Sequence, residues 1–140
     1  MDGSKATLEI NNYLGGAYHL TADEVVVEGS NYVIQESKNC TSGFLPSISD
    51  IKDGLFKLIL FSNLDSLQLN SNGVDFSVRL KLTGTTVIDK LQLPCTQNEF
   101  EVFLTMNKNH CTPKHIQILR LLNEETTLNP RLTVEIGRNF

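Results

Sequence analysis

The sequence lacks a long apolar segment. Its longest apolar run, GLFKLILF at residues 54–61, is interrupted by Lys57 and is far shorter than the roughly 20 residues of a membrane-spanning helix. The first ten residues, MDGSKATLEI, contain no basic segment followed by an apolar one, which is the pattern of a secretory signal. From these two absences we expect a cytoplasmic protein without membrane association.

Cysteine is also scarce. The chain has three cysteines, at positions 40, 95 and 111, an odd number with wide spacing. A disulfide framework needs cysteines in pairs, so this pattern argues against one and favours a reducing compartment.

Positive charge is in the minority, with 12 Lys or Arg against 16 Asp or Glu and a net charge of −4. This balance argues against a nonspecific nucleic-acid binder. The charge is unevenly spread, since residues 1–78 hold 4 basic and 10 acidic residues, whereas residues 79–140 hold 8 and 6. Two interpretations remain open: an acidic metal-binding pocket beside a phosphate-facing surface, or ordinary scatter.

What the chain does have is the composition of a globular domain. It has 140 residues, of which 40% are hydrophobic and 20% charged, enough to bury a core. We expect a single domain over residues 1–140, which is either a whole protein, a fragment or one subunit of a larger enzyme.

Local patterns predict a mixture of helices and strands. The N-terminal half is expected to form a helix over 4–14 that Ser4 caps, a hairpin of strands at 24–29 and 32–38, and a helix over 48–62 that follows Ser47. The C-terminal half is expected to form strands at 76–84, 86–93 and 131–136, with helices at 98–109 and 113–125. The order predicts an α/β (α+β) fold, a mixed central sheet flanked by helices, in which 32–38 and 76–83 are parallel neighbours.

Two charged side chains stand out in the stretch YVIQESKNC. Glu36 and Lys38 are two residues apart, so in a strand they lie on the same side as Ile34. The hairpin brings Asp23, at the start of its first strand, towards the same end. Two close carboxylates repel each other unless a cation lies between them, and oxygen ligands favour Mg²⁺ or Mn²⁺. A lysine beside such an ion can orient or deprotonate a water, as metal-assisted phosphodiester hydrolysis requires.

The segments TADE and IQESK resemble the PD-(D/E)XK pattern of the restriction-endonuclease-like superfamily. Ala22-Asp23 stands in place of Pro-Asp, and Glu36-Ser37-Lys38 matches (D/E)XK. The following LPSISDIKDGLFKLILFSNL is similar to the helix after this motif in type II restriction enzymes. The resemblance covers residues 20–84 well and the remainder poorly, and the alanine at position 22 departs from the pattern.

This resemblance implies an αβββαβ core and Mg²⁺-dependent cleavage of double-stranded DNA, with Mn²⁺ as a substitute metal. Asp23 and Glu36 would be metal ligands, together with the main-chain carbonyl of Ser37, and Lys38 would activate the water. Glu9 would be an additional acid from the first helix. Because one such site cuts one strand, a homodimer or a second nuclease subunit is expected.

Other assignments of the same residues remain open. Glu24 and Glu28 are rival acids in the first hairpin strand. Four further residues are candidates for contact with DNA phosphates, against the simpler interpretation that they are solvated or cap a helix; they are Ser49, Lys52, Arg79 and Lys81.

A second kind of site and a second class of function are weaker alternatives. His110, Cys111 and His115 are close in sequence, with Cys95 upstream, which suggests zinc, although no pair has the usual spacing. The acid pair could also be merely solvated, in which case the chain is a non-catalytic interaction module or a degenerate nuclease fold that binds DNA without cutting it.

Overall fold

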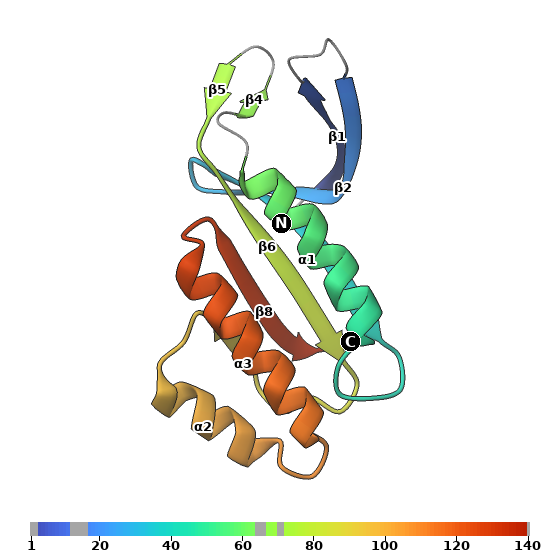
Figure 1. Ribbon diagram of the computed structural model, residues 1–140, viewed down its shortest axis with the longest axis vertical. Helices are drawn as coiled ribbons and strands as arrows, with labels where there is room; N and C mark the ends of the chain where they lie inside the picture. The colour runs from blue at the N-terminus through green and yellow to red at the C-terminus, as the bar shows by residue number, and fades with distance from the viewer. Residues whose placement is uncertain (1–2, 12–16, 64–66, 70–71, 140) are drawn as a thin grey trace.

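The computed structural model describes residues 3–11, 17–63, 67–69 and 72–139, with side chains for 24–63 and 75–139. Figure 1 shows a mixed sheet with helices packed against it. In chain order the elements are β1 (Gly3–Asn11), β2 (Ala17–Glu28), β3 (Asn31–Cys40), α1 (Ile48–Ser62), β4 (Leu67–Leu69), β5 (Asn72–Val74), β6 (Phe76–Gly84), β7 (Leu91–Leu93), α2 (Gln97–Met106), α3 (Pro113–Leu128) and β8 (Leu132–Arg138).

The main sheet has six strands in the order β1-β2-β3-β6-β8-β7, and β4 pairs with β5 in a separate two-stranded sheet. Strands β1, β2 and β3 form an antiparallel meander. Strand β6 then lies parallel to β3, and β8 lies parallel to β6. The predicted mixed sheet of an α+β protein is therefore confirmed, as is the parallel pairing of β3 with β6.

The helices that contact the parallel strands cover one face of the sheet. Helix α1 packs on β3 and β6, and α3 packs on β8 and β7; in Figure 1 both helices lie across the sheet on the viewer's side. Two parallel crossovers of the usual right-handed sense, running in one direction along a sheet, place their helices on the same side. The burial of β6 alternates strictly, since Phe76, Val78, Leu80 and Leu82 are buried and the residues between them are half-buried. The core therefore lies between this face and the helices.

Helix α1 has the predicted bounds for clear local reasons. Ser47 is its N-cap, and the hydroxyl oxygen of Ser47 accepts a hydrogen bond from the Asp50 backbone N–H at 3.1 Å. Ile51, Leu58 and Phe61 recur at helical spacing and are buried against the sheet. Gly54 is also buried: a Cβ there would lie 3.0 Å from Leu80 Cδ1 and 3.3 Å from Lys38 Cε. The missing side chain lets α1 pack closely over β3 and β6.

The first predicted element is wrong, because residues 3–11 form a strand and not a helix. Strand β1 pairs antiparallel with β2, with Leu8 opposite Leu20 and Ile10 opposite Tyr18. Ala6, Leu8 and Ile10 recur every second residue, the period of a strand, and β2 supplies the partner that sequence patterns do not reveal. The αβββαβ order of the resemblance is therefore present only as βββαβ among the described residues.

The predicted strand over residues 86–93 is mostly wrong as well. Only Leu91–Leu93 forms a strand, β7, which pairs antiparallel with β8. Asp89 has a φ of 66°, in the left-handed region that interrupts an extended strand. The backbone N–H of Ile88 donates to Asn107 Oδ1 at 2.7 Å instead of to a neighbouring strand. This segment therefore forms a loop beside the sheet.

The hairpin of β2 and β3, helices α2 and α3, and strand β8 confirm the remaining predictions. Their boundaries are shifted by up to three residues, except that β2 begins at Ala17, seven residues before the predicted start. In the part of the chain that the structure describes, no helix is long and apolar enough to cross a membrane.

Candidate functional site

Glu36 and Lys38 lie on the face of β3 that the helices cover. Glu36 is 1% exposed, and its carboxylate Oε1 lies 3.6 Å from Nζ of Lys57 on α1. Burying a carboxylate is costly unless an opposite charge accompanies it, and the Lys57 ammonium supplies that charge. The acid of the predicted motif is therefore a buried charge held by a helix.

Lys38 has its own partner on the same helix. Its Nζ lies 3.6 Å from Oδ2 of Asp53, and the Lys38 stem passes close to Gly54. Asp53 and Lys57 are one helical turn apart, so one side of α1 presents an acid to Lys38 and a base to Glu36. Four alternating charges thus line the junction of β3 and α1.

Asp23 is located by its backbone alone, since its side chain lies outside the described residues. The pairing of β2 with β3 runs from Glu28 opposite Asn31 to Glu24 opposite Gln35. One further step of this register leads to Asp23 and Glu36. The observed pairing ends at Glu24 and Gln35, so the predicted partnership of these two acids stays a prediction.

The rival acids Glu24 and Glu28 lie on the other face. Glu24 is opposite Gln35, which adjoins Glu36 in β3, so Glu24 and Glu36 face opposite sides of the hairpin. Glu28 has the same parity as Glu24 and lies on the same side. The Gln35 amide donates to the Glu24 carboxylate, and Arg79 Nε donates to Gln35 Oε1 at 2.6 Å. Arg79 also forms an ion pair with Glu28 at 3.0 Å. Neither rival can join Glu36 in one metal site.

The predicted additional acid, Glu9, does not lie on a helix. It is in β1, where its backbone pairs with His19, and its side chain lies outside the described residues. The resemblance implied an acid that projects from a first helix. This part of the prediction is wrong, because residues 3–11 form a strand.

The hydroxyl of Ser37 lies on the open face, opposite Glu36, and its Oγ lies 3.5 Å from Oε1 of Glu24. Only its main-chain carbonyl, as predicted, is a candidate metal ligand. Of the candidate DNA contacts, Ser49 and Lys52 are exposed in the first turns of α1. Arg79 is engaged by Gln35 and Glu28, whereas Lys81 forms no ion pair with any described residue.

Lys57 and Asp53 were missed as members of this site. The signal was in the sequence, because Lys57 interrupts an otherwise apolar helical run and Asp53 precedes it by four residues. A charged residue inside an apolar stripe indicates a buried partner, but its identity depends on which strand the helix covers.

Among the histidine and cysteine candidates, His115 has a structural role at the start of α3. His115 Nδ1 accepts the Thr112 backbone N–H at 3.2 Å in a capping box of α3, and its ring stacks on Phe44 with centroids 5.3 Å apart. Burial lowers the pKa of His115 and raises the pKa of the Cys111 and Cys95 thiols, so the thiols stay protonated near neutral pH.

A metal ion fits this chain only in part. Over the described residues, no group of three or more His, Cys, Asp or Glu side chains is arranged to hold a metal ion. In the described part of the junction, Glu36 is the one carboxylate on β3 that faces the helix. A second carboxylate ligand from β2 would have to be that of Asp23, whose side chain lies outside the described residues.

Comparison with known proteins gives no family. No family model matches the chain, and no curated protein and no solved structure is similar to it.

Proposed function

We propose that the protein is a Mg²⁺-dependent endonuclease that hydrolyses phosphodiester bonds of double-stranded DNA, in the manner of type II restriction enzymes. The observation that carries the proposal is the placement of Glu36 and Lys38 on one face of β3, in a hairpin whose register leads to Asp23. The antiparallel meander followed by a helix and a parallel strand also agrees with the βββαβ part of the core that the resemblance implies.

In this proposal Asp23, Glu36 and the Ser37 carbonyl hold the divalent ion, which would neutralise charge on the scissile phosphate. Lys38 orients the attacking water. Lys57 acts as the counter-charge of Glu36 in the absence of metal, because a buried carboxylate needs a cation in either state. A cut through both strands requires two copies of the site, hence a homodimer or a second nuclease subunit.

The test is incubation of supercoiled and linear mixed-sequence duplex DNA with the protein in Mg²⁺, with EDTA as the metal-free control. We expect nicks or double-strand cuts with the unmodified chain, and a loss of roughly 10²-fold or more with Lys38→Ala or Glu36→Gln, because each removes a group that acts at the reacting phosphate. Lys114→Ala, an exposed change on α3, is the matched control and should cut normally. Normal cutting by either site variant would refute the assignment.

A second candidate function is favoured by the burial of Glu36. An acid that is 1% exposed and already paired with Lys57 is also what a degenerate nuclease fold would contain, one that binds DNA or a protein without cutting. Retention of duplex DNA in EDTA, together with no cleavage in Mg²⁺ or Mn²⁺, would support this candidate over the enzyme.

A further inference from the structure

Strand β7 forms one edge of the main sheet. It pairs with β8 on one side, with Leu91 opposite Ile136 and Leu93 opposite Val134. On its other side, residues 91–93 form no hydrogen bond with any residue that the structure describes. An edge strand carries a row of N–H and C=O groups with which another extended chain can pair. The edge of β7 therefore has the backbone groups to hold one more strand.

Helix α2 lies along this edge and leaves a groove between itself and β7. The edge groove has a volume of about 340 Å³ and is lined by residues 89–92 on the strand side and by Asn98, Glu99, Val102, Phe103 and Met106 on α2. The Ile88 backbone N–H donates to Asn107 Oδ1 at 2.7 Å, which fixes the C-terminal end of α2 beside the start of β7. The helix and the strand therefore run in opposite directions along the groove.

The wall that α2 contributes to the edge groove is apolar and exposed. Val102 and Met106 are four residues apart, so they lie on one face of the helix, and they are 51% and 42% exposed. The buried side chains of Leu91 and Phe103 also line the groove. An extended peptide binds such a surface by pairing its backbone with the edge strand while alternate side chains enter the groove.

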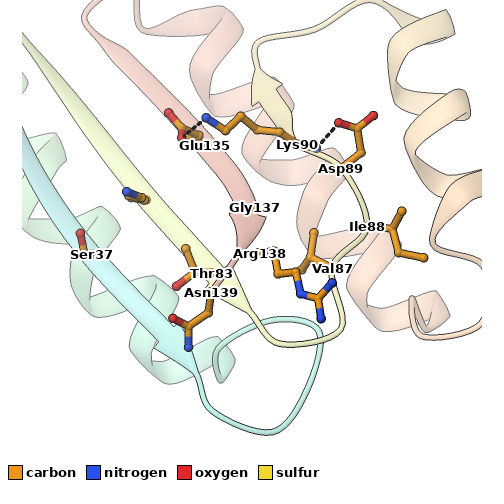
Figure 2. A pocket seen from close by; sticks show the side chains of 11 residues that line it. Ser37, Thr83, Val87, Ile88, Asp89, Lys90, Glu135, Gly137, Arg138 and Asn139 are labelled. Atoms are coloured by element: carbon orange, nitrogen blue, oxygen red, sulfur yellow. Dashed lines mark hydrogen bonds and ion pairs between the residues drawn. The ribbon is translucent and has the colours of Figure 1, made fainter.

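The two ends of the edge groove are acidic. Asp89 precedes β7 and Glu99 lies in the first turn of α2, so the opposite directions of strand and helix put these acids at opposite ends. Neither acid forms an ion pair with any described residue. The basic residue of the lining, Lys90, lies 3.1 Å from Glu135, and Figure 2 shows its side chain pointing towards Glu135 and away from Asp89. The groove therefore keeps two negative charges for a ligand.

We propose that the edge groove binds an extended peptide segment of another protein, in which an apolar residue lies between two basic ones. The apolar side chain contacts Val102 and Met106, and the basic side chains reach Asp89 and Glu99. Every second side chain of a strand points to the same side, so the basic and apolar residues alternate with unspecified ones over five residues, the length of residues 89–93. Strands β6 and β8 separate this groove from the proposed nuclease site, on which it does not depend.

The test is fluorescence polarisation of a fluorescein-labelled, C-terminally amidated peptide, Lys-Thr-Leu-Thr-Lys, titrated with the full chain in EDTA. We expect saturable binding, and none for Glu-Thr-Leu-Thr-Glu, whose charges repel both acids. Two further peptides carry a methyl group on the backbone nitrogen of the leucine or of the threonine that follows it. Adjacent N–H groups of a strand point to opposite sides, so one methylation should weaken binding by about tenfold or more and the other should have little effect.

Variants of the chain make the result specific to the edge groove. Val102→Lys puts a cation into the apolar wall and should abolish binding, whereas Leu121→Lys, a comparable change at an exposed residue of α3, should leave it intact. Asp89→Asn removes one charge and should weaken binding about threefold, since asparagine tolerates the φ of 66° at this position. Glu124→Gln on α3 is its control and should bind normally. Thermal unfolding of each variant verifies that it folds.

Three results would overturn the proposal. They are no saturable binding of Lys-Thr-Leu-Thr-Lys up to roughly 1 mM, equal losses from the two methylations, and equal losses in Val102→Lys and Leu121→Lys. Sedimentation equilibrium of the unmodified chain tests the other occupant, a second copy. A dimer that Val102→Lys dissociates would mean that a second copy fills the groove in place of a basic peptide.

Discussion

Neighbouring residues of β3 lie on opposite faces of the sheet and have different surroundings. Glu36 and Lys38 point towards α1, where each meets one charge of the helix. Gln35 and Ser37 point to the opposite face, where the buried Gln35 joins Glu24 and Arg79 in a hydrogen-bonded network. Strand parity therefore separates Glu36 from Glu24 and Glu28, which lie on the other face of the hairpin.

The largest expected effect is a difference in stability between substitutions at two adjacent residues of β6, Leu80 and Lys81, which lie on opposite faces of the sheet. Leu80 is fully buried beneath α1, and we expect Leu80→Ala to lower the free energy of unfolding by about 2–5 kcal/mol, through lost apolar contact and a cavity. Lys81→Ala, one residue along on the open face, should change it by less than about 0.5 kcal/mol. Urea unfolding measures both. Equal losses would mean that the two faces do not differ as described.

The next effect concerns the counter-charge of Glu36. Lys57→Met leaves a buried carboxylate without its ammonium, and the free energy of unfolding should fall by about 1–3 kcal/mol. If a divalent ion can take the place of Lys57, added Mg²⁺ should restore part of this loss in the variant. Thermal unfolding with and without Mg²⁺ measures the recovery.

Lys52→Met, an exposed change on the same helix, is the control and should show neither the loss nor the recovery. A Lys57→Met protein that is destabilised but indifferent to both Mg²⁺ and Mn²⁺ would argue against a metal at Glu36.

A smaller effect should arise on the open face. Arg79→Lys keeps the positive charge but loses the fork that contacts Gln35 and Glu28 together, so we expect a loss of about 1 kcal/mol in urea unfolding. Arg138→Lys, which breaks no ion pair with the described residues, should be neutral. A neutral Arg79→Lys would show that the network adds nothing to stability.

The smallest effect should be a dependence of stability on pH that originates at His115, in the first turn of α3. Burial lowers the pKa of His115, so the unfolded chain binds a proton there more readily than the folded one. The contribution of neutral His115 is complete above the unfolded pKa of about 6.5 and diminishes as the pH falls below it. Urea unfolding at pH 7.5 and pH 5.5 should show this loss.

His115→Gln keeps an acceptor at the third position of α3 and removes the titration. The difference in stability between pH 7.5 and pH 5.5 should therefore be smaller in this variant than in the unmodified chain. An unchanged difference would place the titrating group elsewhere.

The parts of the fold that the sequence predicted are those specified locally. Helix α1 has a cap at Ser47 and a sustained apolar stripe, and the β2–β3 hairpin has two β-branched runs around a short turn. Strand β1 was missed because its few apolar residues, Ala6, Leu8 and Ile10, suit either period in so short a segment. Its partner β2 decides between them, and that pairing is a tertiary property.

The candidate site also has a part that local sequence patterns predicted and a part that depends on tertiary packing. The shared face of Glu36 and Lys38 followed from strand parity, whereas the observed pairing of β2 with β3 ends one residue short of Asp23 and Glu36, whose partnership stays a prediction. Their contacts with Lys57 and Asp53 depend on where α1 crosses β3, which no local pattern specifies. The edge groove was missed for a similar reason, because it forms only where α2 lies along β7.

The most direct measurement is anomalous scattering from crystals soaked in Mn²⁺, for the unmodified protein and for Glu36→Gln. We predict a peak within coordination distance of the Glu36 carboxylate, shared with Asp23, that the substitution removes. Crystals that take up Mn²⁺ elsewhere or not at all, with the Glu36–Lys57 ion pair undisturbed, would contradict it.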